Sequence, residues 1–176
     1  MERLSGEVVD RLDEMVRRSE TAFDDAAVVM GARKLRFTHW YDRVLSSVGL
    51  LVGSDRLLFG EGVYDATDHA GRVFVLTDRA AIVVSLESVD GDVAVWEVTA
   101  VPRGSVTSIT VSTEMGANTE LRQNRTWPGM VTLTIHYDSL DTPVVVHAAG
   151  FDRFDSTKKA PVLELLEAIR DDLAKH

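Results

Sequence analysis

The sequence contains no cysteine in its 176 residues. Disulfides, thiolate zinc sites, iron–sulfur clusters and cysteine nucleophiles are therefore excluded. The lack of cysteine fits a reducing cytosol. The charged N-terminus, MERLSGEVVDRLDE, also lacks the apolar stretch of a secretory signal, so we expect a cytoplasmic protein.

Long apolar runs and an excess of positive charge are missing as well. No run approaches the roughly 20 residues that span a bilayer, and the formal net charge is −9. Nucleic acids and anionic lipids are bound by clustered cations. We therefore expect no nucleic-acid partner, and a membrane partner is disfavoured.

Motifs that carry chemistry are also absent. The chain has no glycine-rich phosphate loop, no G-x-S-x-G elbow and no H-E-x-x-H pair. The neighbouring carboxylates of Asp24-Asp25 and of Asp171-Asp172 would point about 100° apart on a helix, so we predict solvated surface for both pairs. We expect no catalytic residue and no cofactor, and a small enzyme is only a third hypothesis.

The N-terminal part of the chain has helical periodicity. Residues 6–18 predict a short amphipathic helix. Ser19–Asp25 is predicted as a polar break, and Ala26–Leu35 as a second helix.

The clearest helical stripe in the sequence is Phe37–Val48. Thr38 is the expected N-cap of this helix and Gly49 its expected end. Core packing is the expected role of Trp40 in the stripe, and contact with a partner is the alternative.

The centre of the chain, Gly71–Glu87, predicts a buried hairpin. Its two β-branched runs, Val73–Leu76 and Ala80–Val84, are joined by Thr77-Asp78-Arg79. Because neither run alternates with polar residues, we expect both of their faces to be covered.

Further short strands surround this hairpin. A second hairpin should turn at Asp90-Gly91, because Asp-Gly is a strong turn signal. The other expected strands are Leu57–Tyr64, Val106–Ser112, an edge strand near Glu120–Gln123, and a last hairpin of Met130–Tyr137 with Val144–Ala149. Pro161 suits the first turn of a terminal helix.

These elements predict an α+β fold. Seven or eight antiparallel strands without crossover helices must form a barrel or sandwich to hide their edges. The N-terminal helices would cover one face and the C-terminal helix would close the sheet. We predict an N-terminal helical segment, 1–52, and a sheet domain, 53–176, that form one compact unit.

The strand pattern resembles the bacterial pleckstrin-homology-like (PH-like) domains, relatives of the GRAM domains. The resemblance covers residues 57–175 and rests on five segments: FVLTDRAAIVV, VPRGSVTSITV, GMVTLTIHY, PVVVHAAGF and APVLELLEAIRDDL. It implies a barrel of the PH type that binds proteins, peptides or lipids and often self-associates. The family's first turn is usually basic, whereas this chain has Thr77-Asp78-Arg79, so binding of phosphate groups is doubtful.

Two histidines are weak candidates for a metal site. If Ser139–Thr142 closes the last hairpin, His136 pairs with Val145 and His147 is its diagonal neighbour on the same face. A metal needs three or four ligands, so we expect a solvated sheet face and no metal.

Two segments are candidates for binding a partner. The first is the basic–aromatic stretch of Arg33, Lys34, Arg36 and Trp40; the second is a long loop with Arg122, Arg125 and Trp127. Tryptophan and arginine are enriched at interface hot spots, although solvated charge beside a core helix is the favoured explanation of the first segment and an ordinary hairpin connection that of the second.

The sequence therefore predicts a non-catalytic module that binds another protein or its own copies as a homo-oligomer. The alternative function is binding of a small ligand or a lipid headgroup at the mouth of the barrel.

Overall fold

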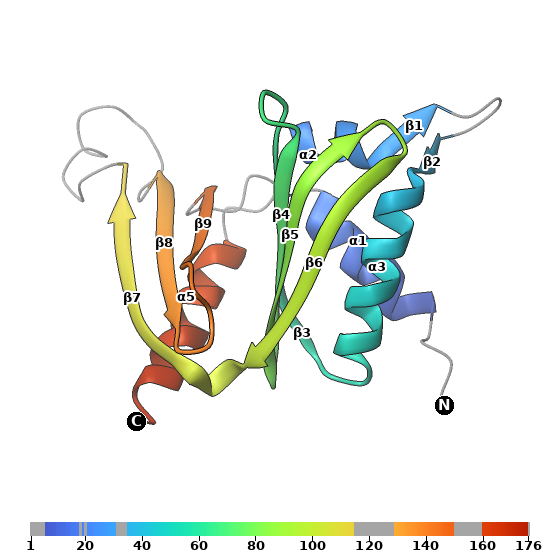
Figure 1. Cartoon of the computed structure of the whole chain (residues 1–176). Coiled ribbons are helices and arrows are strands. Elements are labelled where there is room, and N and C mark those ends of the chain that lie inside the picture. Colours follow the sequence, from blue (N-terminus) through green and yellow to red (C-terminus); the bar gives the residue numbers. More distant parts are fainter. Residues whose placement is uncertain are drawn as a thin grey trace. The chain divides into compact units, whose positions relative to one another are not determined.

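The computed structural model describes residues 6–17, 19, 21–30, 35–114, 129–149 and 160–175. The chain divides into two compact units, Met1–Pro102 and Arg103–His176. The first unit holds α1 (Gly6–Arg17), α2 (Thr21–Ala27), β1 (Val28–Met30), β2 (Leu35–Phe37), α3 (His39–Val52), β3 (Leu57–Asp65), β4 (Ala70–Thr77), β5 (Ala80–Asp90) and β6 (Val93–Pro102). The second holds the 3-10 turn η1 (Arg103–Ser105), β7 (Val106–Thr113), β8 (Met130–Tyr137), β9 (Val144–Ala149) and α5 (Pro161–Leu173) (Figure 1).

The first unit is built on an antiparallel sheet with the strand order β3-β4-β5-β6. The predicted central hairpin is confirmed, because β4 and β5 pair from Gly71 with Leu86 to Leu76 with Ala81. Its turn is fixed by the Thr77 hydroxyl, which accepts the N–H of Ala80 at 2.9 Å.

The second predicted hairpin is also confirmed, with its turn one residue later than expected. Asp90 pairs with Val93, so the two-residue loop is Gly91-Asp92. Gly91 has φ +56°, a conformation that is unstrained for glycine and costly for most other residues.

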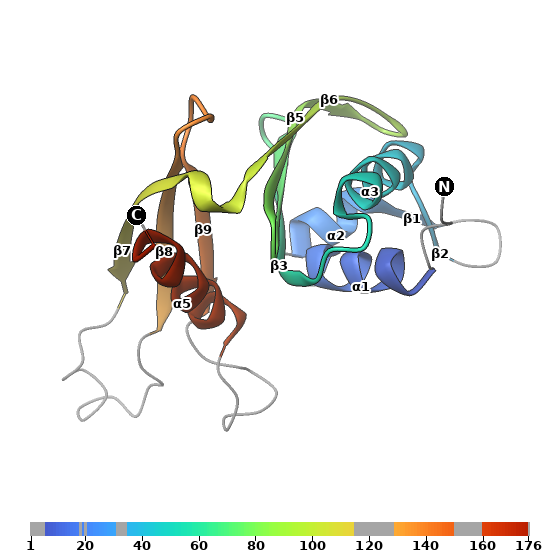
Figure 2. The same cartoon turned by 90° about the horizontal axis from the view of Figure 1, so that it is seen from below.

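One face of this sheet is covered by α1, α2 and α3 (Figure 2). Apolar side chains from the helices and from β4 and β5 form one core cluster. Gly62 lets α2 approach β3, because a Cβ at this position would lie 2.8 Å from the ring of Phe23. The Ser19 hydroxyl ties the preceding turn to β3 by donating to the Gly62 carbonyl at 2.9 Å.

Val73–Leu76 of β4 is buried along its whole length. Neighbouring residues of a strand point to opposite faces, so both faces of this run are buried, as the missing alternation predicts. Trp96 on β6 is half-buried, with the guanidinium of Arg43 5.0 Å from its ring centroid.

Two predictions for the N-terminal part are wrong. Thr21–Ala27 is a helix rather than part of a polar break, and the segment predicted as a helix, Ala26–Leu35, contains β1 and the first residue of β2. The Ala27 carbonyl accepts the N–H of Thr38 at 2.9 Å, and Val28 pairs with Phe37. This strand pairing, together with the β-branched side chain of Val28, outweighs a weak helical pattern.

The helix predicted from Phe37 is α3. Its N-cap is Thr38, whose hydroxyl accepts the N–H of Tyr41. Gly49 does not end the helix as expected. The helix continues to Val52, and Gly53, at φ +54°, donates its N–H to the Gly49 carbonyl, so the left-handed cap is the next glycine along.

The second unit is an antiparallel sheet with the order β7-β8-β9, packed on α5 (Figure 1). The last hairpin has its predicted bounds, and α5 begins at Pro161 after Ala160. Leu133 and Ile135 of β8 are buried, as is Ile169 of α5, whereas Leu166 of α5 is half-buried.

The described strands form separate sheets rather than one closed ladder. β3–β6 and β7–β9 each have their own hydrogen-bond pairing, so the α+β class and the antiparallel sheets are confirmed, and the described strands show no closed barrel. The expected edge strand near Glu120–Gln123 lies outside the described residues.

Candidate functional site

The basic–aromatic stretch is only partly visible. Arg33 and Lys34 lie outside the described residues. Arg36 is exposed on β2. Trp40 is only 1 % exposed and packs edge-on against Phe23 with 6.1 Å between ring centroids, so it is a core residue, the role expected from the helical stripe.

The second candidate segment cannot be placed. Arg122, Arg125 and Trp127 all lie outside the described residues. They stay a prediction, to be tested by substitution rather than by geometry.

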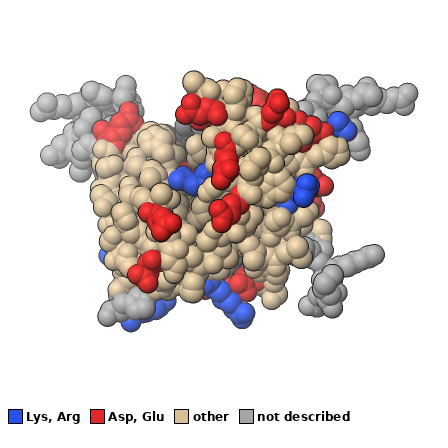
Figure 3. All heavy atoms as spheres, viewed as in Figure 1, with Lys and Arg blue, Asp and Glu red and all other residues tan. Residues whose placement is uncertain are grey.

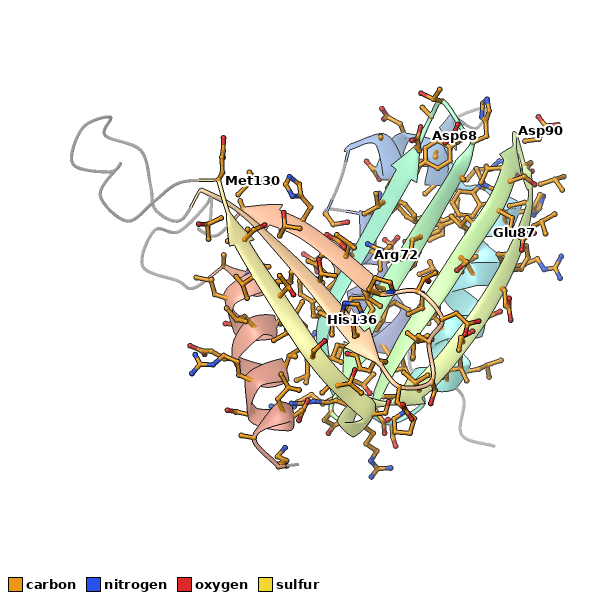
Figure 4. The ribbon with its side chains drawn as sticks, turned by 60° about the vertical axis from the view of Figure 1, so that its left-hand side comes forward. Asp68, Arg72, Glu87, Asp90, Met130 and His136 are labelled. Atoms are coloured by element: carbon orange, nitrogen blue, oxygen red, sulfur yellow. The ribbon has the colours of Figure 1, made fainter. Side chains whose placement is uncertain are left out.

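The two histidines share a sheet face, but the predicted register was wrong. Thr134, not His136, pairs with Val145, and His147 pairs with Thr132. His136 therefore lies four residues along β8 from Thr132, which is about 13 Å at the usual rise of a strand. Figure 4 labels His136 and Met130 towards opposite ends of β8.

This separation prevents the histidines from sharing one metal ion. His147 instead contacts the Thr132 hydroxyl through Nδ1 at 2.7 Å. No group of three or more histidine and carboxylate side chains that could hold a metal ion occurs in the parts of the chain that the structure describes.

A charged cluster around the buried Asp172 joins η1 to α5 in the second unit. Arg103 of η1 donates to the carboxylate of Asp172 and, at 3.0 Å, to the Ala168 carbonyl. Lys175 donates to the other carboxylate oxygen at 3.1 Å. Asp172 is 4 % exposed, so the prediction of solvated surface was wrong for this residue.

The cluster ties α5 to the start of the sheet rather than forming an open reaction site. Tyr137 lies beside it, and its buried hydroxyl has no hydrogen-bond partner in the described structure. Burial, and then the negative charge of Asp172, raise the pKa of Tyr137 above its usual value, while Arg103 acts in the opposite direction.

Replacing Tyr137 with Phe should leave stability at neutral pH unchanged within about 0.5 kcal/mol or raise it, because the lost hydroxyl has no partner. The raised pKa keeps the folded tyrosine protonated. The protonated Tyr137 contributes its full stability below about pH 10, the pKa of tyrosine in an unfolded chain. This stability is lost as the pH rises from there towards the raised pKa of Tyr137 in the folded protein. Tyr137→Phe should therefore lose less stability than the wild type above about pH 10.

Urea midpoints at neutral and alkaline pH measure both effects. Tyr41→Phe is the matched control, because the Tyr41 hydroxyl donates to Asp13 at 3.0 Å and its loss should cost about 1 kcal/mol at neutral pH. A loss of that size in Tyr137→Phe would show that its hydroxyl has a partner after all.

A shallow depression of about 470 Å³ lies at one end of the first unit. It is lined by α2 and by the turns after β3 and β5: Ala22, Asp25, Ala26, Thr38, Tyr64, Ala66, His69, Val89, Asp90 and Gly91. His69 holds the turn with φ +51°, and its carbonyl accepts the N–H of Val89 at 2.7 Å.

The surroundings of this depression are acidic. Among the described residues, its lining contains two carboxylates, Asp25 and Asp90, and no lysine or arginine. Figure 3 shows acidic side chains over the same end of the unit, and Figure 4 labels Asp68, Asp90 and Glu87 there. Such a site would favour a cationic group and repel a phosphate.

The outer edge of β7 is the second feature that could bind a partner. β7 is eight residues long and pairs only with β8 among the described strands. Its segment Val106–Thr113, VTSITVST, has no charged residue and no proline. The sequence analysis predicted this strand but did not predict that it lies at the edge of a sheet. The lack of charged residues in the strand was the sequence feature that could have marked it as a binding edge.

No described helix is long and apolar enough to cross a membrane.

No protein-family model matches the sequence. No curated protein matches it either. The structure is similar to that of a DUF1696 family protein with a pleckstrin-homology domain from Shewanella loihica PV-4, with 18 % identity and a TM-score of 0.39 over 75 % of this chain and 92 % of that one. It is also similar to a pleckstrin homology domain from Shewanella amazonensis SB2B, with 15 % identity and a TM-score of 0.40 over 75 % of this chain and 96 % of that one.

Proposed function

We propose that this chain is a non-catalytic protein-interaction module of the PH-like type, with a barrel built from its two sheets, that binds an extended segment along the outer edge of β7. The observation that carries the proposal is that, among the described strands, none pairs with this edge. Natural proteins usually protect edge strands with charge, proline or short length, and β7 has neither charge nor proline over its eight residues.

The backbone of β7 is oriented to accept such a segment. The N–H of Glu114 donates to the Met130 carbonyl at 2.9 Å, which identifies this as a hydrogen-bonded pair of the ladder. Such pairs alternate along antiparallel strands. The N–H and C=O groups of Ile109 and Val111 therefore point away from β8, towards the open edge.

The other edge strands are less suited to this role. β6 carries Glu97 and ends at Pro102, and α1 packs against β3. β9 is shorter, with six residues. Addition of a strand is a common mode of peptide recognition in which main-chain hydrogen bonds supply affinity, and β7 offers the longest stretch without charge.

A displayed library of random heptapeptides tests this function with the full chain as bait. We expect enrichment of uncharged, β-branched peptides. Val111→Pro should abolish their binding, because it removes an outward N–H, whereas the control Val111→Thr keeps the N–H and the branched shape and should retain binding. Enriched peptides that bind Val111→Pro as well as the wild type would place the site elsewhere.

Binding of a small cationic ligand at the acidic depression is the second candidate function, because Asp25 and Asp90 line it and none of the described lining residues is a lysine or arginine. The lipid-headgroup alternative lacks this support. Co-sedimentation with phosphatidylserine vesicles should be absent at physiological salt. Salt-sensitive co-sedimentation that is lost in the triple variant Arg33→Ala, Lys34→Ala and Arg36→Ala would overturn the protein-partner proposal.

A further inference from the structure

The sequence of β7 is nearly symmetric about its central residue. Thr107–Thr113 reads T-S-I-T-V-S-T, a palindrome about Thr110 in which isoleucine and valine are the only unlike pair. An interface with two-fold symmetry needs a self-complementary surface, because each residue i then meets residue j of the other copy and the reverse. A palindromic strand meets this requirement along its length.

We propose that β7 pairs antiparallel with β7 of a second copy of this chain, about a two-fold axis through Thr110. This inference rests on the proposed function, since it uses the same edge and names the partner. Ile109 of each copy would then lie opposite Val111 of the other, with serine opposite serine and threonine opposite threonine.

The hydrogen bonds of the strand allow this register. The outward groups of β7 belong to Ile109 and Val111, as the Glu114–Met130 bond shows. Centring on Thr110 pairs outward residues with outward residues, so each Ile109–Val111 pair can exchange both of its N–H···O bonds. A register shifted by one residue would set outward groups against groups already bonded to β8.

The side chains match the same arrangement. Ile109 lies opposite Ile135 and Val111 opposite Leu133, so both residues belong to the apolar face of their sheet. Val111 is nevertheless 43 % exposed. In the dimer, Ile109 of the second copy lies beside it and covers part of this surface.

Charge favours a second copy at this edge over other edges of the molecule. Each chain carries −9, so two copies repel one another in general. Val106–Thr113 is free of charge, and the register places the two Glu114 side chains at opposite ends of the paired strands. The interface is small by the standard of stable dimers, so the mass should depend on concentration.

Cysteine substitution in the full chain tests the register, because the sequence has no cysteine of its own. Thr110 faces itself across the axis as a non-hydrogen-bonded pair with Cα atoms about 4.5 Å apart, a spacing that a disulfide can bridge. Ser108→Cys is the matched control: it is on the same strand and face, exposed, and opposite Ser112 rather than itself. Mild oxidation should cross-link Thr110→Cys and leave Ser108→Cys as single chains.

Mass in solution over a concentration series gives an independent readout. The wild type should rise towards twice the 19.4 kDa of one chain. Thr110→Lys and Thr110→Glu should each stay single, because like charges would face one another, and mixing the two variants should restore the dimer.

The possible failures separate the two proposals. Equal cross-linking of Ser108→Cys, or single chains of the wild type at every concentration, would overturn the dimer. If heptapeptides still bind in a manner sensitive to Val111→Pro, the proposed function stands without the dimer; if they do not, both are wrong.

Discussion

Removal of residues 1–52 should leave a fragment that aggregates or forms a new oligomer. The helices of this segment cover the apolar face of β4 and β5, where Val73, Val75 and Ile82 belong to the same core cluster as Trp40 and Tyr41. Deletion exposes this face as one large apolar patch, and such patches drive association.

Two substitutions in α3 test, without truncation, whether this helix is part of the same core as the sheet. Val44 is 1 % exposed and Leu50 is 69 % exposed. Val44→Asp buries a carboxylate without a partner and should cost several kcal/mol, whereas Leu50→Asp should change stability by less than about 0.5 kcal/mol. Urea unfolding and light scattering measure both variants.

The contrary result has a clear meaning. If a chain that begins at Gly53 is soluble, monomeric and as heat-stable as the full chain, the N-terminal helices form a separate module. Search for a partner would then start with those helices and with exposed Arg36 rather than with the sheet.

Replacing Asp172 with Ala should destabilise the second unit strongly. Arg103 would keep its hydrogen bond to the Ala168 carbonyl but would lose the carboxylate that neutralises the charge of its guanidinium group. Removing one partner of a buried ion pair costs about 3 kcal/mol or more, because the remaining charge is left uncompensated. Urea midpoints with unchanged slope would measure this loss.

The neighbouring residue supplies the control. Asp171 is exposed, so Asp171→Ala should change stability by less than about 0.5 kcal/mol. The double variant Arg103→Leu with Asp172→Leu should recover much of the loss, because an apolar pair of similar size often replaces a buried ion pair at little cost. Equal effects of Asp171→Ala and Asp172→Ala would contradict the buried pair.

The sequence by itself determined the elements whose signals are local. The β-branched runs on both sides of Thr77 specified a hairpin, and Thr38 specified the start of a helix. Both signals act within a few residues, through turn chemistry and capping, so they are legible without knowledge of the rest of the chain.

The tertiary structure alone decided features that depend on distant partners. Val28 joined a strand because it pairs with Phe37, and Asp172 is buried because Arg103, remote in sequence, lies against it. The register of β8 and β9 separates His136 from His147. A change of register by two residues moves paired side chains apart along the strands but leaves each on the same face of the sheet, so the alternation in the sequence does not reveal it. The open edge of β7 likewise follows from strand order, and strand order is set by packing rather than by the residues of β7.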